Sequence, residues 1–140
     1  MDHDLLDVKL NQLVHVLRET EAWLTVPSSE FGRDTKLVRA CQRNLQLLVE
    51  YASDINGIFV LELGTKVPGS YRESFAAVFA LDVLKGLSAL DRMALFASVD
   101  WRNDLIHEYE PAESNDVFYA RLKEFLAAYR NYAAAIHDHR

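Results

Sequence analysis

The chain has 140 residues, a length typical of one domain that buries most of its apolar surface around a single core. Half of its residues are hydrophobic and 26% are charged, which excludes disordered and fibrous classes. Its net charge of -6 argues against a general nucleic-acid coat protein, although a local basic groove stays compatible with it. We therefore predict one domain over residues 1–140.

Membrane and secretory segments are not indicated. The longest wholly apolar run, from Phe75 to Leu81, is too short to span a bilayer, and the charged start Met1-Asp2-His3-Asp4 does not resemble a signal peptide. The lone cysteine, Cys41, cannot form an internal disulfide, and its apolar helical setting predicts a core position. We expect a cytoplasmic protein in a reducing compartment.

The first predicted helix runs from about residue 2 to residue 24. Its leucines recur at spacings of three, four or their sums, which is typical of one helical stripe: Leu6, Leu10, Leu13, Leu17 and Leu24. The segment Val26-Pro27-Ser28-Ser29 ends it, because proline breaks helix interiors.

The second predicted helix is the longest. It extends from an N-cap at Asp34 to about Leu63, where Gly64 suits a C-terminal stop. Its core stripe is predicted as Leu37, Cys41, Leu45, Leu48, Ala52, Ile55 and Phe59.

The opposite side of this second helix changes character along its length. It begins with the cations Lys36, Arg39 and Arg43, which suit contact with an anion, although a merely solvated face is the commoner reason for such a stripe. It continues with the apolar Leu47, Tyr51, Ile58 and Leu61. This second apolar face predicts burial against another helix or against another subunit.

A third helix is predicted to begin at Ser70, since Ser70 and Glu73 have the spacing of a capping box, and to end before Gly86. Its apolar side is Phe75, Val78, Phe79 and Val83.

The fourth helix begins around Ser88, with Asp91 in its first turn, and ends at Glu110-Pro111-Ala112. Its predicted buried side is Leu90, Ala94, Ala97, Trp101 and Leu105. The last helix begins at about Asn115 or Asp116 and buries Phe118, Leu122, Phe125, Tyr129 and Ile136. Helices joined by short connections favour antiparallel neighbours, so we predict an all-α, up-and-down bundle of four main helices plus a short extra one.

The stretch from Trp101 to Tyr109 is the densest in candidate chemistry. Arg102 is a fixed cation that can bind a phosphate, and His107 can exchange protons near neutral pH, a combination that suits phosphodiester cleavage. A polar helix end with a salt-bridged arginine is the alternative. On an ideal helix Arg102 and His107 point about 140° apart, so both reach one phosphate only if the helix bends or two subunits combine their motifs.

Other constellations are weaker. His137-Asp138-His139 could hold a metal ion, but a frayed terminal segment is the simpler interpretation. Gly64 and Gly69 lack the ordered glycines and lysine of a phosphate loop, and no serine, histidine and aspartate have hydrolase spacing. We predict no cofactor and no metal site.

The motif Arg102-x4-His107-x-Tyr109 resembles that of the HepT-like toxins within the HEPN superfamily. The likeness covers most of the chain. Its further elements are the long second helix with Arg43 and Asp54, the loop Pro68-Gly69-Ser70-Tyr71 followed by Phe75, and the pair Arg102-Asn103.

This resemblance implies a HEPN-like fold and a metal-independent endoribonuclease toxin, active on tRNA or mRNA as a homodimer whose two motifs meet in a cleft. Arg102 would bind the scissile phosphate, His107 would be the general acid or base, and Asn103 would orient the site. The RNA's own 2′-hydroxyl would attack. Tyr109 resembles the residue that a partner nucleotidyltransferase antitoxin, of the MNT type, modifies with AMP.

A second function remains open from the sequence. The chain also resembles non-catalytic HEPN-type helical subunits that bind substrate or partners for a nucleotidyltransferase. The intact Arg102, His107 and Tyr109 favour the ribonuclease, whereas the acidic net charge favours the binding subunit.

Overall fold

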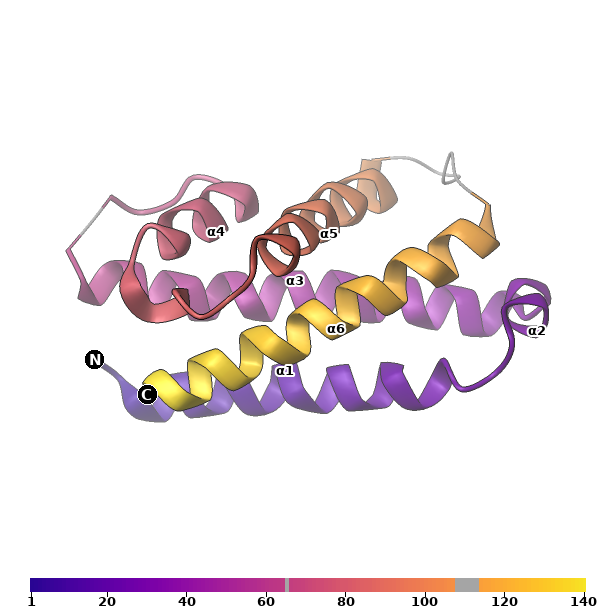
Figure 1. Cartoon of the computed structure of the whole chain (residues 1–140), viewed down its shortest axis with the longest axis horizontal. Helices are drawn as coiled ribbons and strands as arrows, with labels where there is room; N and C mark the ends of the chain where they lie inside the picture. Colours follow the sequence, from indigo (N-terminus) through magenta and orange to yellow (C-terminus); the bar gives the residue numbers. More distant parts are fainter. Residues whose placement is uncertain (65, 108–113) are drawn as a thin grey trace.

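The computed structural model describes residues 1–64, 66–107 and 114–140, and for His107 the backbone alone. Four long helices dominate it: α1 (His3–Trp23), α3 (Thr35–Glu62), α5 (Ala89–His107) and α6 (Asn115–His139). Figure 1 shows successive long helices running in opposite directions along the length of the molecule, with α6 crossing the bundle obliquely. The predicted all-helical, antiparallel bundle is confirmed.

The predicted starts of the second, fourth and last helices are confirmed, because their capping side chains occupy the expected places. The predicted end of the fourth helix, at Glu110-Pro111-Ala112, lies outside the described residues. The Asp34 carboxylate accepts a hydrogen bond from the backbone N–H of Leu37, and the Ser88 hydroxyl accepts one from that of Asp91. After α3, Gly64 adopts a φ of 80°, the left-handed conformation that glycine reaches without steric cost. Ser114 caps α6 in the same way as Asp34 caps α3.

Two short elements differ from the prediction. α1 ends at Trp23, before Pro27, and Pro27 precedes a further helix, α2 (Ser28–Arg33). Phe31 of α2 is wholly buried against the rings of Phe118 and Tyr119. The sequence did not predict α2, because six residues are too few for a periodic pattern.

The predicted third helix is too long. The structure has α4 (Tyr71–Phe79), after which Leu81 is extended, with a ψ of 161°, and a 3-10 turn, η1 (Asp82–Leu84), follows. The apolar pattern continues across the break because Val83 and Leu84 are buried from η1 rather than from a helix.

The core confirms most predicted stripes. All the predicted stripe leucines of α1 are buried, as are the predicted residues of α6 and those of α3, except that Leu37 is only half-buried. Cys41 is also wholly buried, and this desolvation raises the pKa of its thiol to about 12.

The predicted buried side of α5 is wrong at its start. Leu90 is 77% exposed, and Ala94, Ala97, Trp101 and Leu105 are only half-buried, whereas Leu95 and Val99 are fully buried. The reason is that α5 packs against α6 on one side and against α3 and α4 on another. The fully buried residues Leu95 and Val99 therefore lie between these two packing surfaces, and half-buried apolar residues lie on either side of them.

The second apolar face of α3 has a partner within the chain. Leu47, Tyr51 and Ile58 are half-buried against the core, on a helix that contacts both α4 and α5. Leu61 is 74% exposed, so only the end of this face stays open.

Hydrogen-bonded tyrosines join α6 to its neighbours. The Tyr129 and Ser98 hydroxyls are 2.8 Å apart, and the Tyr132 hydroxyl donates to Asn56 Oδ1 at 2.6 Å. Both tyrosines are wholly buried, which raises their pKa above the ordinary value. The predicted burial of Tyr129 is confirmed.

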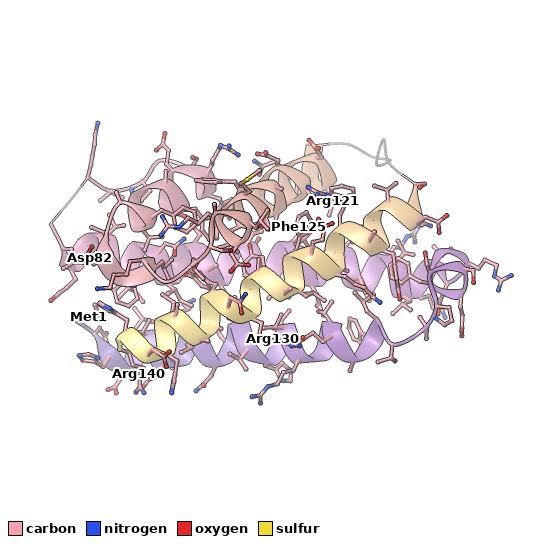
Figure 2. The ribbon with its side chains drawn as sticks, in the orientation of Figure 1. Met1, Asp82, Arg121, Phe125, Arg130 and Arg140 are labelled. Atoms are coloured by element: carbon pink, nitrogen blue, oxygen red, sulfur yellow. The ribbon has the colours of Figure 1, made fainter. Side chains whose placement is uncertain are left out.

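Ion pairs along α6 fix its position on the first helix. The labelled Arg130 and Arg140 lie along α6 in Figure 2, and they pair with Glu21 and Asp7 of α1. Because the four long helices alternate in direction, the two chain termini lie at the same end of the bundle (Figure 1). Within the described residues, no helix is both long and apolar enough to cross a membrane.

Candidate active site

Arg102 lies in the last turns of α5 with its side chain only 14% exposed. Its guanidinium carbon is 4.4 Å from the centre of the Tyr71 ring, at the first residue of α4. Around the edge of the guanidinium, Nη1 donates to Asn103 Oδ1 at 3.3 Å, and Nη2 donates to the Tyr71 hydroxyl at 3.4 Å. The arginine is therefore held between two helices by an aromatic face and polar groups.

Glu50 of α3 supplies the counter-charge. Its carboxylate lies 3.5 Å from Arg102 Nη2 and is one-third exposed. This contact and the two hydrogen bonds are long, while Nε is buried and has no hydrogen-bond partner in the described part of the chain. A guanidinium has five N–H donors, so this one is incompletely satisfied and keeps capacity for an added anion.

The cap at the start of α4 positions Tyr71. The Ser70 hydroxyl accepts from the Glu73 backbone N–H, and the Glu73 carboxylate accepts from the Gly69 backbone N–H at 2.6 Å. The predicted helix start is confirmed, but the glutamate returns to Gly69 rather than to Ser70. This network fixes the direction in which the chain enters α4 and hence the place of the Tyr71 ring.

Aromatic packing holds the end of α5. The Trp101 ring stacks on Phe118 of α6 with centroids 5.7 Å apart and also contacts Phe125. Because Trp101 faces α6, the next residue, Arg102, is turned towards α3 and α4. Arg72 pairs with Asp100 at 3.0 Å and fastens α4 to α5 beside the site.

A groove of about 750 Å³ opens beside Tyr71 and Asn103, and Arg102 lies behind these two residues and does not itself line it. The groove lies among the start of α1, the second half of α3, the loop at residues 67–70 and the start of α4. Both Tyr71 and Asn103 line it, so the residues that hold Arg102 also form one wall of the groove.

The three cations predicted to contact an anion, and hence to be RNA-binding candidates, are all exposed. Lys36, Arg39 and Arg43 lie in the first half of α3, and Arg43 donates to Gln46 at 3.2 Å. On an ideal helix Glu50 is two turns, or about 10 Å, beyond Arg43 on the same face. The basic stripe thus runs along α3 towards the carboxylate that contacts Arg102.

Two predicted site residues are not placed beside the others. The backbone of His107 forms the end of α5, but its side chain lies outside the described part of the structure, and so does the whole of Tyr109. The structure therefore brings together Arg102 and Asn103 but does not test the distance from Arg102 to His107.

The histidines at the C-terminus belong to α6, which continues to His139. The His139 ring lies 5.6 Å from that of Phe59, edge to face. In residues 1–64, 66–107 and 114–140 there is no group of three or more side chains suited to hold a metal ion.

The sequence did not indicate Glu50 as part of the site, and it indicated Tyr71 only as part of the loop that resembles the HepT-like family. The signal for Glu50 was its position seven residues after Arg43, on the face that carries the cations. No pattern in the sequence could indicate that Tyr71 meets Arg102, since thirty residues separate them.

The family of the chain follows from its match to the Ribonuclease HepT-like family over residues 12–136. The match spans most of the sequence, and the chain belongs to this family. The predicted resemblance is confirmed. Comparison with curated protein sequences gives no significant match.

Solved structures share the fold at low sequence identity. A tri-AMPylated HEPN toxin of Shewanella oneidensis, in complex with MNT antitoxin, has a TM-score of 0.83 and 20% identity, covering 99% of both chains. A toxin-antitoxin structure with AMP-PNP has a TM-score of 0.82 and 18% identity, covering 96% of this chain and 98% of that one. A mutant MntA-HpeT toxin-antitoxin structure has a TM-score of 0.80 and 20% identity, with the same coverage.

Proposed function

We propose that the protein is the toxin of a toxin-antitoxin pair and acts as a metal-independent endoribonuclease on tRNA or mRNA. The observation that carries this proposal is the environment of Arg102, an incompletely satisfied guanidinium held against Tyr71, which lines a groove. Membership of the HepT-like ribonuclease family supports it.

Arg102 binds the scissile phosphate and stabilises the charge that builds on its oxygens during the reaction. The phosphate replaces the long contacts of the guanidinium to Glu50 and Tyr71. Asn103 orients the guanidinium through its amide oxygen.

His107 moves the protons. As a base it takes the proton of the RNA's 2′-hydroxyl, which attacks phosphorus, and as an acid it protonates the leaving 5′-oxygen. No protein nucleophile is needed, because the RNA supplies its own.

Two copies of the chain complete the site. Arg102 lies on the buried side of α5 between α3 and α4, and an ideal helix carries residue 107 about 140° further round. A homodimer in which the Arg102 of one copy and the His107 of the other meet at one phosphate resolves this separation. A monomer at micromolar concentration by light scattering would remove the two-copy site from the mechanism.

A nucleotidyltransferase antitoxin silences the toxin by transferring AMP to Tyr109. The modification places bulk and negative charge seven residues from Arg102, which opposes the binding of RNA phosphate. Similar solved structures support this, since they are of toxin-antitoxin pairs and the toxin in one of them is tri-AMPylated. With the purified partner and ATP, wild type gains AMP mass, whereas Tyr109→Phe does not; the same gain on Tyr109→Phe would place the modification elsewhere.

A growth assay separates the ribonuclease from a non-catalytic binding subunit. Expression of the wild type without antitoxin is expected to arrest growth, while His107→Ala is expected to be tolerated. Equal growth of both would favour the binding subunit of a nucleotidyltransferase and would contradict the toxin.

A further inference from the structure

The groove beside Arg102 has no role in the mechanism above. Its volume of about 750 Å³ lies within the range of small-molecule sites, about 300–1,000 Å³. Ile58, Leu61, Val67 and Pro68 give it apolar walls, and Leu61 and Val67 are 74% and 77% exposed.

The charges of the groove cancel each other. Lys9 of α1 and Asp54 of α3, which both line it, are paired at 3.0 Å. A neutral, partly apolar groove does not attract a phosphate, whereas the adjacent Arg102 does. The charge distribution therefore separates a place for a phosphate from a place for an uncharged, flat group next to it.

Hydrogen-bond donors along one wall of the groove can pair with the polar edge of a flat, uncharged ligand. Because arginine only donates, the Asn103 amide must turn its oxygen towards Arg102, and its NH2 group makes no hydrogen bond with the residues that the structure describes. The Ser70 hydroxyl oxygen accepts from Glu73, which leaves the hydroxyl proton available as a donor. These donors and the Tyr71 ring offer the contacts that nucleobases make, namely hydrogen bonds at the edge and an aromatic wall.

Gly57 leaves the space open. It lies within α3, where glycine lowers helix stability relative to alanine, and it lines the groove. A Cβ added at Gly57 would meet no atom within 4 Å, so packing within the described chain does not require this glycine.

We propose that this groove is a nucleobase subsite, which holds a base of the RNA whose neighbouring phosphate is bound by Arg102. The inference rests on the proposed ribonuclease function and adds to it the part of the substrate that is recognised. One nucleotide thus contacts the protein twice, through its phosphate at the guanidinium and through its base at the wall formed by Tyr71 and Asn103.

The test fills the groove without touching Arg102. Gly57→Leu extends a side chain into the open space, while Gly57→Ala adds only a methyl group, and both changes favour the helix. Binding of two uncleavable probes is measured: a mixed-sequence 2′-fluoro RNA decamer and an abasic decamer with the same backbone. Thermal melting checks that both variants are folded at least as stably as the wild type.

Wild type and Gly57→Ala are expected to bind the base-bearing decamer about tenfold or more tightly than the abasic one, as base stacking predicts. Gly57→Leu is expected to lose that preference and to bind both probes like the abasic decamer. The subsite would be overturned if Gly57→Leu kept the full preference for the base-bearing decamer, or if the wild type showed no such preference. If Gly57→Leu keeps discrimination but weakens self-association or antitoxin binding, the groove is a protein interface instead.

Arg102→Ala separates the two proposals. If Arg102→Ala weakens the binding of both probes equally while Gly57→Leu changes neither, the nucleobase subsite is wrong and the phosphate site at Arg102 is supported. If Arg102→Ala binds both probes as tightly as the wild type, or if the wild type binds neither, the phosphate site is wrong and the subsite falls with it.

Discussion

The guanidinium of Arg102 lies over the ring of Tyr71, with 4.4 Å between the guanidinium carbon and the ring centre. This contact links the motif at the end of α5 to the capped start of α4, two places that are far apart in sequence. It keeps a mostly buried cation oriented behind the wall of the groove, and it makes Tyr71 a positioning residue for the proposed reaction.

Removal of the Tyr71 ring is expected to lower RNA cleavage. A cation–π contact contributes about 0.5–2 kcal/mol, so Tyr71→Leu should reduce kcat/KM roughly 2- to 30-fold. Tyr71→Phe is the matched control, since it keeps the ring and loses only the 3.4 Å contact of the hydroxyl. Initial rates on a short fluorogenic RNA provide the measurement. Equal losses in the two variants would mean that the hydroxyl, not the ring, positions Arg102.

Replacement of Glu50 by glutamine is expected to strengthen RNA binding. Glu50 is the carboxylate nearest to the guanidinium in the described structure and competes with phosphate for it. Neutralising a partly exposed pair of this kind should raise affinity about two- to fivefold at low salt, with the gain fading as salt screens the charges. Titration of an uncleavable RNA at several salt concentrations measures it. Weaker binding by Glu50→Gln would show that Glu50 supports Arg102 rather than competes with phosphate.

The basic stripe of α3 is expected to contact the RNA backbone. Replacing Lys36, Arg39 and Arg43 with glutamine should reduce the slope of log affinity against log salt by about 2, because each lost phosphate contact on a single strand lowers it by about 0.7. The matched control replaces three cations elsewhere, Lys85, Arg121 and Lys123. An equal change in both triple variants would assign the effect to net charge alone.

The buried Cys41 thiol is expected to lower the free energy of unfolding at alkaline pH. Burial raises its pKa from 9.0 to about 12, so the folded chain keeps a proton that the unfolded chain loses. The contribution of Cys41 to the free energy of unfolding is therefore constant below pH 9 and falls as the pH rises towards 12. Urea unfolding from about pH 8 to about pH 10 should show a shallower fall for Cys41→Ala than for the wild type. Parallel curves would contradict a buried thiol.

The long helices were predictable because their signals repeat. Leucines at helical spacing, together with caps such as Asp34 and Ser88, identified the long helices and their starts. The short α2 and the end of α4 were not predictable, because only tertiary contacts fix them. The burial of Phe31 against α6 is one such contact.

The buried side of α5 shows why periodicity alone misleads in a helix with several partners. Leu90 continues the pattern that includes Ala94 and Trp101, yet its side chain is 77% exposed, whereas the next residues, Asp91 and Arg92, hydrogen-bond to α6 and to η1. The same limit applies to the candidate site. The sequence identified Arg102 and Asn103, but only the packing of α3, α4 and α5 shows that Glu50 and Tyr71 meet the arginine.

In the proposed mechanism Arg102 and His107 cleave RNA without a metal ion. The most direct measurement incubates the purified protein with RNA in excess EDTA and analyses the products by mass spectrometry. Wild type is expected to release fragments with 2′,3′-cyclic phosphate ends, while Arg102→Ala and His107→Ala release none. Cleavage by either variant at the wild-type rate, or an intact RNA after incubation with the wild type, would rule out this mechanism.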